Sequence, residues 1–345
     1  MKRIVKGLLF AMVFMTLVVA IFCGTVVYYI MYKPNFVLSG TKYISIHEDH
    51  KDFDVLCRVL QDSAGCRRIQ LFKILAEYRK YPANMKSGYY AIESGMNNNT
   101  LLNRLRLGQQ TPVRITFNNI RLIDELASRL SSQLMIREEG LLSFLQDEKR
   151  CESLGFNTTT VKTMFIPNTY EVYWNIPVDK LMERMKREYD VFWNDNRLNK
   201  AKVLRLSPVE VSILASIVEE ETAMLDEYPV VAGLYINRLY KGMLLQADPT
   251  VKYAAGDFSL RRILNRHKEV DSPYNTYLYA GLPPGPIRIP SISGIDAVLN
   301  FTKHNYLYMC AKDDFSGRHN FAVTLSEHNR NALKYQAELN RRGIR

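Results

Sequence analysis

The chain opens with an apolar pattern that predicts a membrane-spanning helix. Three basic residues come before an uncharged, mostly apolar run over residues 7–31, which Lys33 ends. In a helix, about 25 residues span about 37 Å, enough to cross a bilayer with some tilt. The run is longer than the apolar core of a cleaved signal peptide, and the basic residues before it predict a cytoplasmic N-terminus. We therefore expect a cytoplasmic tail at 1–6, a single-pass helix at 7–32 in the plasma (inner) membrane, and all later residues on its outer side.

The next residues, 36–110, show the pattern of a small module. Alternating or apolar runs predict strands at 43–46 and 87–92, and amphipathic runs predict helices at 53–60, 70–79 and 101–107. We expect Thr100 to cap the last of these helices and Gly108 to end it. Thr111 and Pro112 then mark a boundary.

Beyond that boundary, residues 111–345 mix helical and strand patterns. A strand is predicted at 113–117, and helices at 120–134, 140–146, 180–192, 207–222, 229–239 and 325–341. Segments rich in Gly, Pro, Asn and Asp predict loops at 241–250, 271–290 and 316–321. Loops on a rigid scaffold are where binding and catalytic groups concentrate. The whole pattern predicts an α+β fold.

The predicted helix at 207–222 carries a carboxylate on its apolar face. Ser207 and Glu210 have the spacing of a capping box at its start. Three apolar residues then form a stripe at helical spacing, Leu214, Ile217 and Val218. At about 100° per residue, Glu221 falls near the middle of this stripe, whereas Glu219 and Glu220 turn away. A carboxyl group in apolar surroundings keeps its proton to unusually high pH, which suits a general acid. The alternative is that the stripe ends with the helix and leaves Glu221 in water.

The charge and composition of the chain limit the classes of partner that it could bind. The net charge is +11 and the pI about 9.3, which favours an anionic partner such as nucleic acid, lipid headgroups or wall polymers. The basic residues are scattered and are not interleaved with aromatic residues as in nucleic-acid motifs, so we predict no nucleic-acid partner. The six histidines show no metal-ligand spacing, and we predict neither metal nor cofactor. Cys57 and Cys66 are close enough in sequence for a disulfide, with two independent thiols as the open alternative.

Several motifs follow one another in order between residues 164 and 329. They read SIVEEET at 216–222, YINRL at 235–239, LQADPTV at 245–251, SPYNTY at 272–277 and GLPPGPI at 281–287. Together they closely resemble the endolytic murein transglycosylase family, the YceG-like proteins. The N-terminal span and a small module at 36–110 that resembles a LysM-like domain also fit that family. The resemblance makes 111–345 the catalytic domain.

The resemblance implies a lyase that cuts nascent peptidoglycan strands. Such enzymes cleave between N-acetylmuramic acid and N-acetylglucosamine without water and leave a 1,6-anhydro-muramyl end. In the family motif the catalytic glutamate is the last acidic residue before the threonine, which is Glu221 here. As an acid it protonates the departing glycosidic oxygen, and as a base it then deprotonates the sugar's own C6 hydroxyl, which attacks C1. Because the nucleophile is internal, one carboxylate suffices where a glycoside hydrolase needs two.

The matched loops supply candidates for substrate binding. They are Gln246, Tyr274, Asn275 and Thr276, with Tyr277 as a further hydroxyl or stacking group. For the Asn and Thr side chains, bracing of a turn is the open alternative. Asp248 precedes Pro249, which predicts a turn, although an Asp248 facing Glu221 would revive direct hydrolysis. We expect Arg238 to brace the catalytic helix through a carboxylate.

The predicted partners are glycan strands and the plasma membrane. The family resemblance adds the peptidoglycan synthases. Two other function classes stay open, a non-catalytic wall-binding protein and a hydrolase with two carboxylates. The first predicts glycan binding without cleavage, and the second predicts reducing ends in place of anhydro ends.

Overall fold

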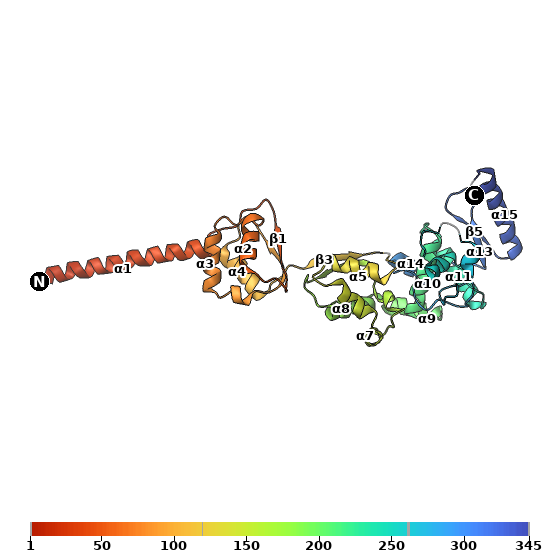
Figure 1. Ribbon diagram of the computed structural model, residues 1–345, viewed down its shortest axis with the longest axis horizontal. Coiled ribbons are helices and arrows are strands. Elements are labelled where there is room, and N and C mark those ends of the chain that lie inside the picture. The colour runs from red at the N-terminus through yellow and green to blue at the C-terminus, as the bar shows by residue number, and fades with distance from the viewer. Residues whose placement is uncertain (1, 119, 261–262, 344–345) are drawn as a thin grey trace. The chain divides into compact units, whose positions relative to one another are not determined.

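The computed structural model describes residues 2–118, 120–260 and 263–343. These residues form two compact units, each described here by itself (Figure 1). The first unit runs to Ile115 and also takes in residues 133–135 and 171–176. The second holds the rest of the chain from Thr116 onward. Helices and strands are mixed in both, as the sequence pattern predicts.

The N-terminal helix, α1 (Lys2–Met31), is long and apolar enough to cross a membrane. The apolar window within Arg3–Met31 is not buried against the protein, so its side chains are free to face lipid. The helix is therefore compatible with a single-pass membrane anchor.

A two-stranded antiparallel sheet and three helices form the body of the first unit. The strands are β1 (Lys42–Ile46) and β2 (Gly88–Ile92), and the helices are α2 (Phe53–Asp62), α3 (Ile69–Tyr78) and α4 (Asn98–Leu107), with a short 3-10 turn η1 (Pro82–Asn84). Ile44 pairs with Tyr90, and both are buried in one apolar core. Asn97 caps α4 by accepting from the Thr100 amide at 2.8 Å, so the cap lies three residues before the predicted one.

The second unit is built mainly of short helices. Its strands β5 (Tyr308–Ala311) and β6 (His319–Ala322) form a two-stranded sheet. Another two-stranded sheet pairs β3 (Val113–Phe117) with β4 (Asn168–Val172), and the division between the units falls within both of these strands. The helices are α5 (Ile123–Ser131), α6 (Glu138–Leu145), α7 (Glu148–Ser153), η2 (Val161–Met164), α8 (Val178–Phe192), α9 (Asp195–Val203), α10 (Pro208–Glu221), α11 (Tyr228–Tyr240), α12 (Asp248–Ala255), α13 (Asn265–Lys268), α14 (Ile292–Leu299) and α15 (Leu325–Arg341).

Two structured elements lie where the sequence pattern predicted loops. Asp248 and Pro249 do not form a turn but are the first two residues of α12. Proline is well tolerated there, because the amide hydrogen that it lacks would have no partner within the helix. The residues around His319 form β6, which pairs antiparallel with β5. Both elements contribute to the site described below.

Helix α10 is the centre of the second unit. Its residues from Val211 to Glu219 are all buried, and it packs against α11, α12 and α14. The predicted capping box is present, since the Glu210 amide donates to the Ser207 hydroxyl at 3.2 Å and the Ser207 amide donates to the Glu210 carboxylate at 2.7 Å. Gly294 lets α14 approach closely, because a Cβ at this position would lie 2.2 Å from a carboxylate oxygen of Glu219.

We expect Gly294→Ala to destabilise the protein by about 1–3 kcal/mol, because the added methyl group overpacks the contact with Glu219. The matched control is Gly140→Ala in α6, where the nearest atom would be 3.7 Å away. There the better helix propensity of alanine should be neutral or stabilise by up to about 1 kcal/mol. Thermal or urea unfolding measures both. Equal shifts for the two variants would contradict the close approach of α14.

Candidate active site

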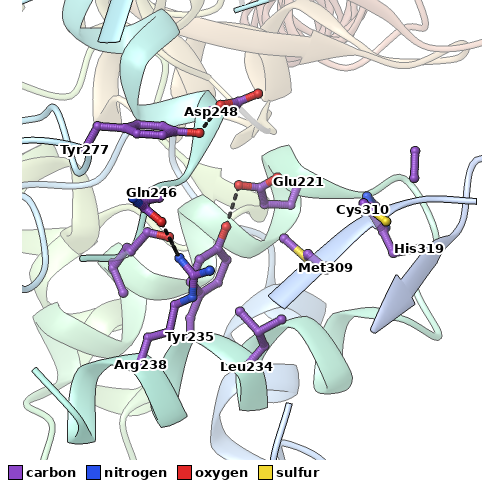
Figure 2. Close-up of a pocket in the computed structure, with 12 residues that line it drawn as sticks. Glu221, Leu234, Tyr235, Arg238, Gln246, Asp248, Tyr277, Met309, Cys310 and His319 are labelled. Atoms are coloured by element: carbon purple, nitrogen blue, oxygen red, sulfur yellow. Dashed lines mark hydrogen bonds between the residues drawn. The ribbon is translucent and has the colours of Figure 1, made fainter. Parts of the chain in front are cut away.

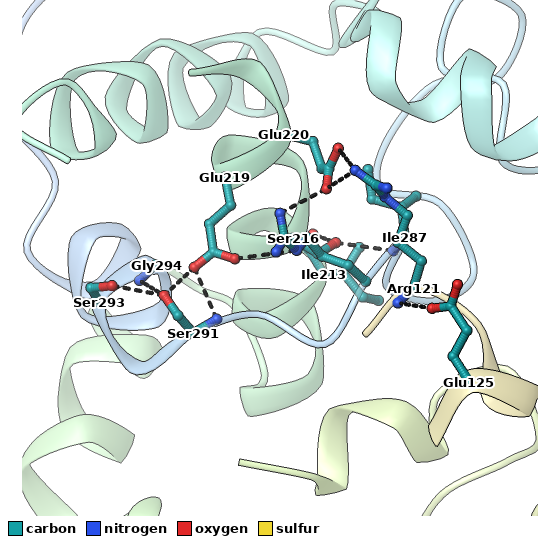
Figure 3. A network of polar contacts seen from close by, with 11 residues as sticks. Arg121, Glu125, Ile213, Ser216, Glu219, Glu220, Ile287, Ser291, Ser293 and Gly294 are labelled. Atoms are coloured by element: carbon teal, nitrogen blue, oxygen red, sulfur yellow. Dashed lines mark hydrogen bonds and ion pairs between the residues drawn. The ribbon is translucent and has the colours of Figure 1, made fainter. Parts of the chain in front are cut away.

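The last turn of α10 directs three consecutive glutamates into three different environments. Successive helical residues point about 100° apart, so neighbours cannot share one face. Glu219 points toward Ser291 at the start of α14, whereas Glu220 points toward Arg121 (Figure 3). Glu220 also accepts from Arg288, and Glu221 lines a pocket. The three directions follow from helical spacing, but Glu219 is buried although the sequence pattern predicts that it turns away from the apolar face, because α10 is enclosed on nearly all sides.

Glu219 and Glu220 anchor the end of the helix. One oxygen of Glu219 accepts from the amide of Ser291 at 2.9 Å and from the Ser291 hydroxyl. Burial raises the pKa of Glu219. Glu220 accepts from Arg121 at 2.8 and 2.9 Å and from Arg288 at 2.7 Å. The final turn of α10 is thus held from two sides, which fixes where Glu221 emerges.

Glu221 lines a pocket of about 240 Å³ formed by residues from α10, α11, α12, β5, β6 and two loops (Figure 2). The lining residues are Glu221, Leu234, Tyr235, Arg238, Leu245, Gln246, Asp248, Tyr277, Met309, Cys310, Ala311 and His319. A pocket this small cannot enclose a drug-sized ligand.

The Glu221 carboxyl is accessible from the pocket and surrounded by protein on its other sides. This burial raises its pKa from 4.5 to about 7. The hydroxyl of Tyr235 donates to it at 2.5 Å and acts in the opposite direction, by stabilising the carboxylate. Smaller effects come from Asp248, whose charge raises the pKa, and from Arg238 and Lys252, which lower it. At neutral pH this group can therefore both donate and accept a proton.

Tyr235 is a site residue to which the sequence analysis gave no role, although it lies in one of the matched motifs. It is fully buried, and burial together with Glu221 raises its pKa well above the ordinary value. Tyr235 therefore stays protonated and remains a donor to Glu221. Tyr235 could have been found from its place in the YINRL motif on α11, the helix that packs against α10.

Arg238 organises the pocket floor. It donates to the backbone carbonyls of Leu307 at 2.6 Å and Leu245 at 2.7 Å, and to the Gln246 side chain at 3.4 Å. The prediction that Arg238 pairs with a carboxylate is wrong, because its hydrogen-bond partners are carbonyl oxygens. Arg238 instead ties the loop that carries Gln246 to the segment before β5.

His319 lines the far side of the pocket and is held by a buried carboxylate. Glu227 accepts from the His319 amide at 2.9 Å and contacts the ring Nδ1 at 3.0 Å. The same carboxylate accepts from Thr222, the C-cap of α10, at 3.1 Å. With the hydrogen on Nδ1, Nε2 is left to accept from a ligand.

The four predicted substrate residues divide into two groups. Gln246 lines the pocket, with its backbone in the left-handed region at φ +50°. Tyr274, Asn275 and Thr276 are not among the described residues that line it.

The three residues outside the pocket lining support its wall. Asn275 is buried and donates to the carbonyls of Lys268 and Val270 at 2.9 and 2.8 Å. The Thr276 hydroxyl accepts from the Ala247 amide at 3.0 Å, and the Tyr274 ring packs on Tyr253. These contacts fix the loops that carry Gln246 and Tyr277. Direct substrate contact by these three residues stays a prediction.

Asp248 and Tyr277 complete the pocket. The sequence analysis gave Asp248 a structural role, yet its carboxylate is exposed in the same pocket as Glu221. The Tyr277 hydroxyl donates to it at 2.6 Å. Among the described residues, no group of three or more His, Cys, Asp or Glu side chains is placed to hold a metal ion.

A pocket with a buried, pKa-raised glutamate at the end of a central helix defines a candidate acid–base site in an α+β domain. The model of the YceG-like family matches residues 44–334, which is most of the chain, and the chain belongs to this family. It is 30% identical over 307 residues to an endolytic murein transglycosylase of Bacillus subtilis, covering 83% of this chain and 82% of that protein.

The chain is also similar to a second relative and, in fold, to a solved structure. An endolytic murein transglycosylase of Streptococcus pneumoniae is 28% identical over 77% of this chain, and the alignment spans 53% of the length of that protein. A crystal structure of a putative YceG-like protein from Listeria monocytogenes has the same fold, with a TM-score of 0.56 and 24% identity over 85% of this chain and 99% of that one.

We expect Glu221→Gln to stabilise the folded protein at high pH. Between pH 4.5 and about 7, the folded state keeps a proton that the unfolded state releases, so folding stability falls as pH rises through this window. The amide removes this penalty. The gain should be about 1–2 kcal/mol above pH 8, less than full linkage because one side of the carboxyl is open to solvent. It should vanish below pH 4.5. Unfolding curves at several pH values measure it, and a gain that does not depend on pH would contradict the raised pKa.

Proposed function

We propose that this protein is a membrane-anchored lytic transglycosylase that cleaves the bond between N-acetylmuramic acid and N-acetylglucosamine in nascent glycan strands. The carrying observation is Glu221, a carboxyl with a pKa of about 7 that is open to a polar pocket. Support also comes from the relatives named endolytic murein transglycosylase.

The proposed reaction uses Glu221 twice. Its proton passes to the glycosidic oxygen as the bond from C1 to that oxygen breaks, and positive charge develops at C1 and the ring oxygen. The carboxylate then takes the proton of the C6 hydroxyl as that oxygen bonds to C1, which gives the 1,6-anhydro end. A pKa near the working pH serves both steps. Tyr235 steadies the carboxylate formed between them.

The proposed arrangement in the cell follows from the apolar helix. A cytoplasmic tail at 1–6 and a transmembrane helix at 7–32 would place a LysM-like module at 36–110 and a catalytic domain at 111–345 outside the plasma membrane. Glycan strands synthesised close to the membrane would then be within reach of the pocket. Peptidoglycan synthases are proposed partners because of the family resemblance.

A second candidate function is hydrolysis with two carboxylates. The observation that favours it is Asp248, which lines the same pocket as Glu221. A hydrolase of this kind would yield reducing N-acetylmuramic acid ends.

The full chain, purified in detergent, should convert glycan strands to products with 1,6-anhydro-muramyl ends, read by mass spectrometry. Glu221→Gln should lower turnover by about 10³-fold or more, because both proton transfers are lost. Glu152→Gln, an exposed glutamate on α7, is the matched control and should retain full activity. Reducing ends alone would favour the hydrolase, and full activity of Glu221→Gln would remove the proposed role of this residue.

Turnover should also decline as pH rises through about 7, because the first step needs the protonated form of Glu221. A pH profile of the initial rate at saturating substrate measures this. Activity that instead declines near pH 4.5 on the way up would show that the acid is not buried.

A further inference from the structure

We propose that Asp248 is a second catalytic carboxylate in this pocket: its negative charge stabilises the positive charge that develops at C1 and the ring oxygen, while Glu221 transfers the proton. The inference rests on the proposed function and deepens it. It assigns a role in the reaction to a residue that the sequence motif alone marks as part of a turn.

The position of Asp248 is fixed by the backbone around it. It is the first residue of α12, and the Ala247 carbonyl just before it accepts from the Thr250 hydroxyl at 2.7 Å. The amides of Gln246 and Ala247 are bound by Thr276, at 3.0 Å each. A carboxylate at the first turn of a helix is also stabilised in its ionised form by the helix dipole. Asp248 is therefore placed by a braced loop and is not a mobile surface group.

Tyr277 orients the Asp248 side chain. Its hydroxyl donates to Oδ1 of Asp248 at 2.6 Å, and burial and this carboxylate together raise the pKa of Tyr277. A carboxylate offers about four acceptor positions, so one bond from Tyr277 leaves the group able to face a ligand. The pocket thus holds two carboxyl–tyrosine pairs, Glu221 with Tyr235 and Asp248 with Tyr277 (Figure 2).

The two carboxyl groups differ in the way that an acid and a stabilising anion must differ. Glu221 is largely enclosed by protein, whereas Asp248 is exposed in the pocket. The charge on Asp248 makes Glu221 hold its proton more tightly, and Arg238 and Lys252 act in the opposite direction. The other titratable side chains of the described lining are Tyr235, Tyr277, Arg238, Cys310 and His319.

The chemical step balances without a further reactant. As the bond from C1 to the glycosidic oxygen breaks, the electron pair leaves with that oxygen, which takes the Glu221 proton. The sugar ring is left with a positive charge, and the negative charge of Asp248 opposes it without forming a bond. The C6 oxygen then supplies the electron pair for the new bond to C1, and its proton returns to Glu221. Asp248 forms no bond and transfers no proton in either step.

The test compares Asp248→Asn and Tyr277→Phe with a matched pair elsewhere in the same unit. Asp271 and Tyr279 make the same hydrogen bond, also at 2.6 Å, outside the pocket lining. Asp271→Asn and Tyr279→Phe therefore report the cost of losing such a bond without touching the site. All variants are made in the full chain, and turnover, KM and the pH profile are measured on glycan strands, with melting temperature as a check on folding.

We expect Asp248→Asn to lower kcat by about 10²-fold with KM within about threefold of wild type, because the lost charge acts on the transition state. Its alkaline limb should also move to lower pH by about half a unit, since Glu221 loses a neighbouring negative charge. Tyr277→Phe, which keeps the charge, should lose less activity. The two control variants should match wild type.

Wild-type kcat and an unmoved alkaline limb in a folded Asp248→Asn protein would overturn the proposal. If Asp248→Asn does not fold, Asp248→Glu is measured instead, because it keeps the negative charge. The proposal expects this variant to retain part of the wild-type kcat, and a folded Asp248→Glu protein without activity would count against it. A wild-type protein that cleaves no glycan would contradict the proposed function itself. Reducing-end products that disappear in Asp248→Asn would assign Asp248 to hydrolysis instead.

Discussion

The burial of α10 is the constraint on which the rest of the second unit depends. A helix buried on nearly all sides has no solvent to take its polar groups, so each carboxyl of its last turn needs its own partner. Glu219 finds Ser291 at the start of α14, and Glu220 finds Arg121 and Arg288. Glu221 lines the candidate site, and among the described residues its carboxyl accepts a hydrogen bond from the Tyr235 hydroxyl. Because its neighbours are anchored, the position of the Glu221 carboxyl is set by the helix and not by a flexible loop.

The local signals in the sequence predicted the parts of the fold that depend on local chemistry. The capping box and the strand at 113–117 follow from neighbouring residues, and the structure contains both. The small cap at Asn97 was missed because both Asn97 and Thr100 suit that role, and only the backbone conformation decides between them. Helix α12 was missed because an Asp-Pro pair can open either a turn or a helix.

The pocket itself was less predictable, since its residues meet only through long-range packing. Gln246 reaches the lining, whereas Asn275 and Thr276, from an equally good motif, are buried and brace the loops. Nothing in the sequence distinguishes an amide that faces a ligand from one that satisfies a turn. Tyr235 and Asp248 could be placed beside Glu221 only once α11 and α12 were packed against α10. Short motifs therefore located the site but did not assign its members.

The hydrogen bond from Tyr235 to Glu221 bears on how protons are conserved over a catalytic cycle. In the proposed reaction the proton lent to the glycosidic oxygen is replaced by one from the C6 hydroxyl, so nothing is exchanged with bulk solvent. Tyr235 keeps its own proton because its pKa is raised, so it does not protonate Glu221. Its hydrogen bond stabilises the Glu221 carboxylate between the two proton transfers. The site would then be ready for its next cut as soon as the strand departs, without waiting for water to recharge it. A cycle that needs no proton from solvent would suit the membrane-anchored enzyme that we propose.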